Sequence, residues 1–297
     1  MTTARPPKGP SAHVTTHPRS IGRAALTAFV ATALLAAPHT THALAASTTD
    51  AIFEIGDGGF LEPIAVRKGG TFINPGSNDG GPSQSLANAA TAAVTSAGNR
   101  VHVIFGGRVI ATVATEHDPN QATAHVTVPP SLHLGGHVTA LASTLGGYAT
   151  SPRRAPTADE RRRALGTAAA TLHTTIAHLT VRNLTAIDLG RGTAFVGTVD
   201  LRGTGTPRTD KRLFFVDEQL KPGTVVQSLH NIMTIKVTEP LLEEPTEYLV
   251  DALDLGNNTP ALITSIIGYD ANTFAIYTRA KTSQTWTKIY TGGGAAM

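Results

Sequence analysis

The sequence predicts a mainly β protein in which two antiparallel β-rich domains are joined by one α-helix. Short runs of β-branched and apolar residues alternate with turns that contain Gly, Pro or Asn over most of the chain. One segment near the middle carries a full set of helix-start signals. Residues 177–297 divide into two sets of four extended runs, which predicts two blade-like four-stranded meanders.

Residues 1–45 are predicted to be a secretory signal peptide. Four basic residues precede the apolar run AALTAFVATALLAAP, and a small-residue cleavage site, Ala43-x-Ala45, follows it. The run is shorter than the ~20 residues of a spanning helix. The whole chain has 24 Lys and Arg against 21 Asp and Glu, so without this segment it is close to neutral. We therefore expect a secreted or cell-envelope protein that has no integral membrane segment and does not bind nucleic acid.

Residues 46–150 are predicted to form a small N-terminal β domain. Two extended runs flank a Gly-containing turn in LEPIAVRKGGTFINP, and two more flank Gly106-Gly107 in VHVIFGGRVIATVA. Because Gly adopts positive φ angles at no steric cost, Gly-Gly predicts a tight hairpin. ATAHVTV and GHVTALAST add two further strands, and LANAATAAV is a candidate short helix.

Residues 151–176 are predicted to be a linker with a helix. Thr157 is followed three residues later by Glu160, which is the spacing of a capping box, and Asp159 adds a second acid to the first turn. Ala and Leu then predict a helix as far as about His173.

Residues 177–297 are predicted to form the C-terminal domain of two meanders. HLTVRNLTAIDL, TAFVGTVDL, KRLFFVDE and GTVVQSL make the first set, and NIMTIKVTE is predicted to be a separate connecting strand. EYLVDALDL, ALITSIIGY, TFAIYTRA and TWTKIYT make the second set. The motif Asp-Leu-Gly-x-x-Thr ends the first strand of each set, as AIDLGRGT and ALDLGNNT, which indicates a repeat.

These motifs resemble the FG-GAP/VCBS type of secreted bacterial β-repeat. The best-matching positions are Asp254, Gly256, Asn257, Asn258, Thr259, Pro260, Ala261, Leu262 and Ile263, and the weaker copy is Asp188, Gly190, Gly192, Thr193, Ala194, Phe195 and Val196. The resemblance implies an acidic turn before an apolar strand, and in the family this turn often binds calcium. Calcium takes six to eight oxygens, and each loop here has one carboxylate, so we expect no calcium and no other cofactor.

Histidines and cysteines do not indicate a metal site either. The chain has no Cys. His133 and His137 have the i, i+4 spacing that serves zinc on a helix, with His125 nearby, but Gly135-Gly136 between them disfavours a helix. Structural histidines are the simpler interpretation.

Aromatic residues concentrate at the C-terminus, where four of the five Tyr and the only Trp lie. Alternate residues of a strand share a face, so Trp286, Lys288 and Tyr290 are predicted to lie together, and Tyr277 with Arg279. An amphipathic surface of this kind is typical of recognition. The alternative, that these rings simply fill a small core, stays open. The predicted ligand-binding residues are Tyr248, Tyr269, Tyr277, Arg279, Trp286, Lys288 and Tyr290.

The predicted function is therefore an exported non-catalytic binding or structural module. Candidate ligands are an extracellular polysaccharide or an envelope protein, the latter also through exposed strand edges. The alternative is a secreted hydrolase that uses a pair of carboxylates across a cleft. Its candidate residues are Glu239, Glu243, Glu244, Glu247, Asp251 and Asp254.

Overall fold

The computed structural model describes residues 49–75, 82–117, 124–134, 138–149, 151–221, 224–237, 245–268, 272–280 and 283–294. All of them belong to one compact unit that runs from Ala43 to Met297. The predicted signal peptide lies outside the described residues. In the described part of the chain, no helix has both the length and the apolar character that crossing a membrane requires.

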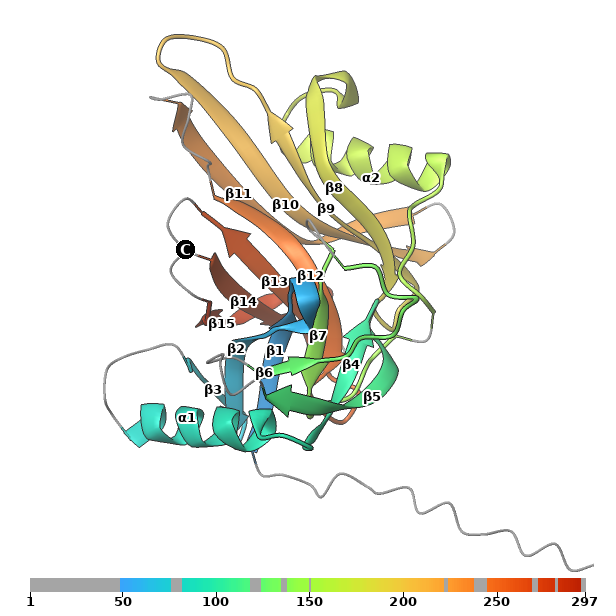
Figure 1. The fold of residues 1–297 in the computed structure, drawn as a ribbon. Helices are drawn as coiled ribbons and strands as arrows, with labels where there is room; N and C mark the ends of the chain where they lie inside the picture. The colour runs from blue at the N-terminus through green and yellow to red at the C-terminus, as the bar shows by residue number, and fades with distance from the viewer. Residues whose placement is uncertain are drawn as a thin grey trace, which may run out of the picture. The chain divides into compact units, whose positions relative to one another are not determined.

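The N-terminal sheet has seven strands in the order β3-β2-β1-β7-β4-β5-β6, all paired antiparallel (Figure 1). Both predicted hairpins are confirmed, since φ is 65° at Gly106 and 74° at Gly107, and it is also positive at Gly69 and Gly70. The strands are β1 Thr49–Ile55, β2 Leu61–Lys68, β3 Thr71–Ile73, β4 Arg100–Phe105, β5 Arg108–His117, β6 Ala124–Val126 and β7 Ala140–Ser143.

The described residues contain two α-helices. The candidate helix at 86–94 is confirmed and is longer than predicted, as α1 at Pro82–Thr95. The linker helix is also confirmed, as α2 at Ala158–Thr171. Its capping box is complete, because the Glu160 N–H donates to the Thr157 hydroxyl at 3.3 Å and the Thr157 N–H donates to the Glu160 carboxylate at 2.8 Å. Arg154 holds the same carboxylate through two bonds of 2.7 Å.

The C-terminal half forms the two predicted four-stranded meanders, so the mainly β fold class is confirmed. The first is ordered β11-β10-β9-β8 and the second β12-β13-β14-β15. The strands of the first are β8 Leu179–Asp188, β9 Thr193–Leu201, β10 Arg208–Lys221 and β11 Thr224–Val237. Those of the second are β12 Thr246–Asp254, β13 Pro260–Ile267, β14 Asn272–Thr278 and β15 Thr287–Gly292.

One strand prediction in this region is wrong. GTVVQSL and NIMTIKVTE are not two strands, because β11 runs unbroken from Thr224 to Val237 alongside β10. No Gly or Pro stands between Thr224 and Val237 to end the strand. The pairing continues over the whole length with two register shifts, one between Val216 and Asp217 and one between Gln219 and Lys221.

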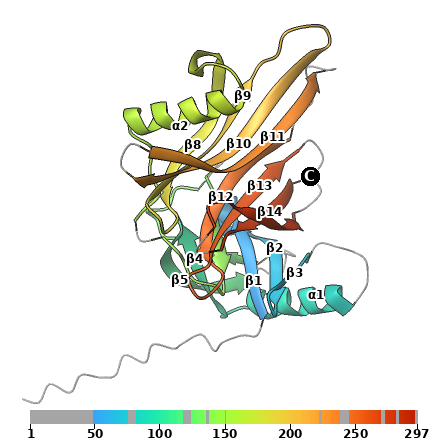
Figure 2. The ribbon, with the colours of Figure 1, turned by 180° about the vertical axis from the view of Figure 1, so that it is seen from behind.

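The sheets and helices are stacked in layers, with four hydrophobic cores between them (Figures 1 and 2). Helix α1 packs on one face of the N-terminal sheet, and the other face of that sheet packs on the second meander. The second meander packs in turn on the first meander, whose outer face α2 covers. The two meanders therefore pack face to face. The cores also cross the domain boundaries predicted at 150 and 177, which themselves stay predictions.

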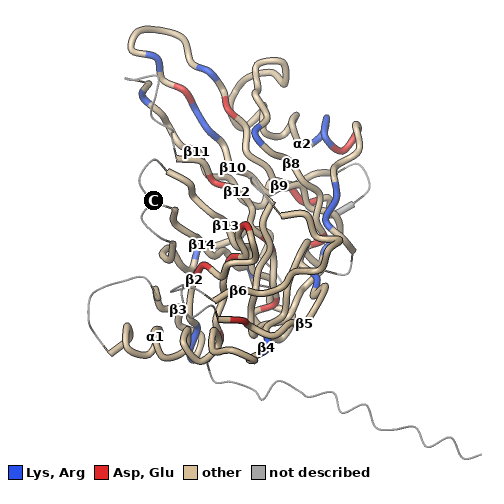
Figure 3. Tube along the Cα trace, viewed as in Figure 1, with Lys and Arg blue, Asp and Glu red and all other residues tan. Residues whose placement is uncertain are grey.

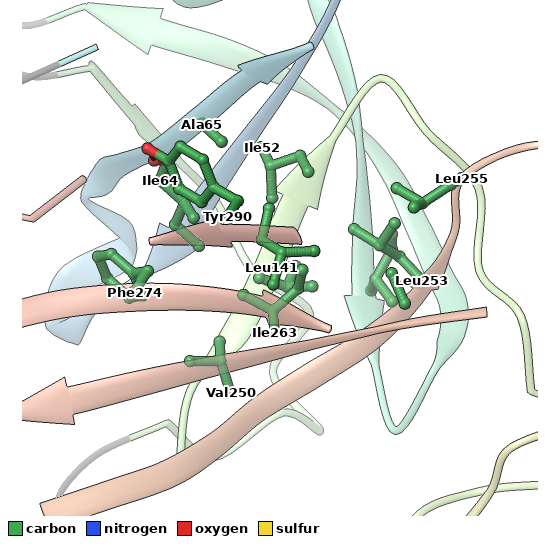
Figure 4. Packing of buried hydrophobic residues seen from close by; sticks show 13 residues of the cluster. Ile52, Ile64, Ala65, Leu141, Val250, Leu253, Leu255, Ile263, Phe274 and Tyr290 are labelled. Carbon is green, nitrogen blue, oxygen red and sulfur yellow. Dashed lines mark hydrogen bonds between the residues drawn. The ribbon is translucent and has the colours of Figure 1, made fainter. Parts of the chain in front are cut away.

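The second meander is the central layer and is buried on both faces. On β14, Phe274 and Ile276 belong to the core shared with the N-terminal sheet. Figure 4 shows Phe274 in this core together with Ile64 and Leu141. Ala275 and Tyr277 point into the core shared with the first meander. Each fully buried aliphatic or Phe side chain contributes about 1.5–3 kcal/mol, so this sheet carries much of the stability.

Candidate functional site

Most of the residues predicted to form an aromatic binding surface lie inside the protein. The exposed fraction is 2% for Tyr277, 6% for Trp286, 9% for Tyr290 and 4% for Arg279. Lys288 is exposed and Tyr248 is half-buried. Tyr269 lies outside the described residues. The expectation of an open aromatic face is wrong for the four buried residues, because both faces of their sheet are covered. A ligand-binding role for the set stays a prediction.

A bulge in β15 also changes which of these residues share a face. Lys288 pairs with Tyr277, whereas Tyr290 pairs with Ile276. Two neighbouring residues of β14 are therefore paired with residues of β15 that have one additional residue between them. A bulge of one residue sends the following side chains to the opposite face. Tyr290 therefore packs in the core with the N-terminal sheet, while Trp286 packs in the core between the meanders. The predicted common face of Trp286, Lys288 and Tyr290 is wrong for this reason.

The structure does bring Tyr277, Arg279, Trp286 and Lys288 together. The Arg279 guanidinium lies 4.7 Å from the centre of the Trp286 ring, and the Lys288 ammonium lies 5.3 Å from the Tyr277 ring. Arg279 also forms a buried ion pair with Glu218 and donates to the Leu189 carbonyl at 2.8 Å. Arg279 thus ties the second meander to the β8–β9 turn of the first.

Glu247 lies at the centre of a buried hydrogen-bond network. Its Oε1 accepts from the Tyr277 hydroxyl at 2.7 Å and from the Thr264 hydroxyl at 2.8 Å, and its Oε2 accepts from the Asn231 amide at 2.8 Å. Burial raises the pKa of Tyr277 well above its usual value, and Glu247 raises it further. These contacts make Glu247 a core acceptor that joins the meanders.

Asp251 fastens the β4–β5 hairpin to the second meander. It is fully buried and accepts from the backbone N–H groups of Gly106 at 2.8 Å and Gly107 at 2.6 Å. Burial raises its pKa to about 6, although Arg153 and the backbone donors act in the opposite direction. The Arg153 guanidinium in turn donates to the Val250 carbonyl at 3.3 Å.

The remaining hydrolase candidates do not form a facing pair among the described residues. Asp254 closes its own turn, because its carboxylate accepts from the N–H groups of Gly256 and Thr259 at 2.8 Å and of Asn258 at 3.2 Å. Glu239, Glu243 and Glu244 lie outside the described residues.

A cavity of about 280 Å³ opens where the two Asp-Leu-Gly turns meet. We call it the turn pocket, and it is lined by Tyr148, Asp188, Gly190, Gly192 and Asn258. Asp188, Gly190 and Gly192 come from the β8–β9 turn and Asn258 from the β12–β13 turn. Tyr148 follows β7 in the N-terminal half. Three segments that are far apart in the sequence therefore supply one site.

Each wall of the turn pocket is fixed by backbone contacts. The Gly190 N–H donates to the Asp188 carboxylate at 2.8 Å, and Gly190 has a φ of 82°. A Cβ atom on Gly190 would lie 2.1 Å from the Tyr148 hydroxyl, so only Gly lets the ring approach this closely. Tyr148 is held in turn by its own N–H, which donates to the Gly107 carbonyl at 2.6 Å.

Charges of both signs surround the Tyr148 hydroxyl. Burial raises its pKa above the usual value. Arg279 and Arg191 lower the pKa, whereas Asp254 and Asp188 raise it. The hydroxyl therefore keeps its proton at neutral pH and can both donate and accept a hydrogen bond.

Elsewhere in the protein, acidic and basic positions also lie next to one another, as along β10 and at the start of α2 (Figure 3).

The sequence carries further signals for this site. Tyr148 is the one Tyr outside the C-terminal cluster, and it stands in the Gly-rich segment Leu145–Ala149. The repeat itself predicts the two turns, but their meeting depends on how the meanders pack. A further signal was the unbroken apolar run Phe274–Tyr277, since a strand without polar alternation is typically buried on both faces.

Among the described residues, no group of three or more His, Cys, Asp or Glu side chains is placed to hold a metal ion. His125 lies 3.2 Å from Glu116, and His133 is exposed. His102 contacts the Thr112 hydroxyl at 2.9 Å, and burial lowers its pKa. His137 lies outside the described residues.

Comparisons of the chain with protein-family models, with curated proteins and with solved structures find no match. The kinship with FG-GAP/VCBS repeats therefore stays a prediction that rests on the two turn motifs.

Proposed function

We propose that this chain is an exported, non-catalytic binding module of the cell envelope or extracellular space, and that the turn pocket is its ligand site. The observation that carries the proposal is the convergence of two turns and Tyr148 on one cavity of about 280 Å³. Concave sites with a few convergent polar groups are where small ligands bind. Export is supported by the signal-peptide pattern of residues 1–45.

The carboxylate chemistry favours binding over hydrolysis. Hydrolysis of a glycosidic bond uses two carboxyl groups that face each other some 5–10 Å apart. Asp188 is the single carboxylate among the described residues that line the turn pocket. Glu247 and Asp251, two of the six hydrolase candidates, are instead buried and accept hydrogen bonds from core groups.

Two adjacent asparagines provide a matched test of this site. Asn257 and Asn258 are both exposed and have nearly equal positive φ angles, 57° and 55°, but only Asn258 lines the turn pocket. Gly adopts the same backbone conformation, so Asn257→Gly and Asn258→Gly remove each side chain without adding strain. The full chain and both variants are tested for binding to cell-wall polymers, soluble polysaccharides and envelope-protein extracts.

We expect Asn258→Gly to weaken the binding that the unmodified chain shows, by about tenfold for one lost hydrogen bond. Asn257→Gly should bind as the parent does. Equal binding by the parent and both variants would exclude the turn pocket as the site. Release of sugar or peptide fragments from any of these polymers would instead favour a hydrolase. Trp286→Ala is unsuitable for this test, since the Trp286 ring is part of a core.

A further inference from the structure

The turn pocket has the features of a site for an uncharged ligand. Two carboxylates, Asp188 and Asp254, and two guanidiniums, Arg191 and Arg279, act on the Tyr148 hydroxyl together. The guanidiniums are already engaged with the protein, because Arg191 donates to the Ser283 carbonyl at 2.6 Å and Arg279 pairs with Glu218. An anion would therefore meet Asp188 at the wall without a cation directed toward it. A cation would meet the two guanidiniums together with the two carboxylates that act on the Tyr148 hydroxyl, so these four groups offer it no excess of negative charge.

The lining groups also match hydroxyls in their hydrogen-bonding capacity. The Tyr148 hydroxyl donates and accepts, the exposed Asn258 amide donates through nitrogen and accepts through oxygen, and the Asp188 carboxylate accepts. A ligand that carries several hydroxyls can form a hydrogen bond with each of these groups, because every hydroxyl is both donor and acceptor. The Tyr148 ring adds a flat apolar surface with its polar group at one end.

The size and walls of the cavity limit the ligand to one small unit. Its volume of about 280 Å³ lies just below the ~300–1,000 Å³ range of small-molecule sites. Gly190 and Gly192 bring no side chain to the wall, and the Tyr148 hydroxyl lies where a Cβ of Gly190 would be. A Cβ at Gly192 would also lie 3.0 Å from the Gln219 carbonyl, so this turn lies close to β10.

We propose that the turn pocket binds a neutral hexose unit, as a free sugar or as the end of a polysaccharide chain, an inference that rests on the function proposed above. Tyr148, Asp188 and Asn258 contact the sugar hydroxyls. The site makes no covalent change to the sugar.

The test measures binding of the full chain to methyl glycosides of glucose, galactose and mannose by saturation-transfer NMR and calorimetry. Three charged relatives are compared under the same conditions: glucuronic acid, glucose 6-phosphate and glucosamine. Short oligosaccharides that end in the bound hexose distinguish a free sugar from a chain end. Tyr148→Phe and Asn258→Gly are the test variants, and Asn257→Gly is the control. Circular dichroism checks that each variant is folded.

We expect at least one neutral glycoside to bind, and each charged relative to bind about tenfold more weakly or not at all. Tyr148→Phe and Asn258→Gly should each weaken binding about tenfold, since each removes one hydrogen-bonding group. Binding of a charged relative as tightly as the neutral sugar would overturn the inference, as would binding of no hexoside. If another ligand then depends on Asn258, the proposed function survives and the sugar class is wrong. If a hexoside binds equally to the parent and to Asn258→Gly, both proposals fail.

Discussion

Replacing Tyr277 with Phe tests whether this residue serves the core or a ligand. The change removes one hydroxyl and leaves the ring, so it creates almost no cavity. That hydroxyl donates to the Glu247 carboxylate at 2.7 Å. Tyr277 is buried, with an exposed fraction of 2%. A hydrogen bond to a charged group contributes about 1.5–3 kcal/mol. We therefore expect Tyr277→Phe to lower the free energy of unfolding by about 2 kcal/mol.

Tyr290→Phe is the matched control. The Tyr290 hydroxyl is also buried and donates at nearly the same distance, 2.8 Å, but its acceptor is the neutral Ile64 carbonyl. A hydrogen bond between neutral groups contributes about 0.5–1.5 kcal/mol. Tyr290→Phe should therefore lower the free energy of unfolding by about half as much as Tyr277→Phe, although both changes remove one hydroxyl from a Tyr.

The assay is urea-induced unfolding at neutral pH, followed by the fluorescence of Trp286, the only Trp in the chain. Trp286 packs in the same core as Tyr277, so its emission reports on this interface. The comparison is valid if the free energy of unfolding falls with urea concentration at the same slope in the parent and in both variants. The reasoning is refuted if Tyr290→Phe costs as much as Tyr277→Phe, or if Tyr277→Phe leaves stability unchanged and abolishes ligand binding.

Two further predictions concern pH and backbone conformation. Burial raises the pKa of Glu54 to about 7 and of Asp217 to about 8, so each stabilises the fold when neutral, and that contribution is lost as the pH rises through these values. Thermal unfolding should therefore occur at a lower temperature at pH 8.5 than at pH 5, and Asp217→Asn should reduce this difference in unfolding temperature. The same difference in the parent and in Asp217→Asn would contradict the prediction. Gly106→Ala should destabilise more than Gly69→Ala, which costs about 1–2 kcal/mol for positive φ alone. A Cβ at Gly106 would lie 2.6 Å from the Arg153 backbone, whereas open space surrounds Gly69; equal losses in urea unfolding would show that the contact does not matter.

Local features were predictable because their causes lie within a few residues of each other. The Gly106-Gly107 hairpin follows from positive φ angles that Gly adopts freely, and it forms as predicted. The start of α2 follows from Thr157 and Glu160, which satisfy each other's backbone N–H groups. Both features need no distant partner.

The candidate site was less predictable because it depends on register and on packing between layers. Counting alternate residues placed Trp286 and Tyr290 on one face, but a one-residue bulge separates them. The position of such a bulge follows from the partner strand, which the local sequence does not specify. The meeting of Asn258 with Asp188 depends likewise on how the two meanders stack.

The sequence by itself determined most of the strands, the turns, the two helices and the position of each Asp-Leu-Gly motif at the end of a first strand. These follow from side-chain alternation, from Gly and Pro conformation and from helix capping, all of which act over short stretches of chain. Only the tertiary structure decided that the second meander is covered on both faces, which places Tyr277 and Trp286 in a core. It also brought Tyr148 against the two turns. Burial of apolar faces between layers selects such contacts, and it does so through the whole fold rather than through any one segment.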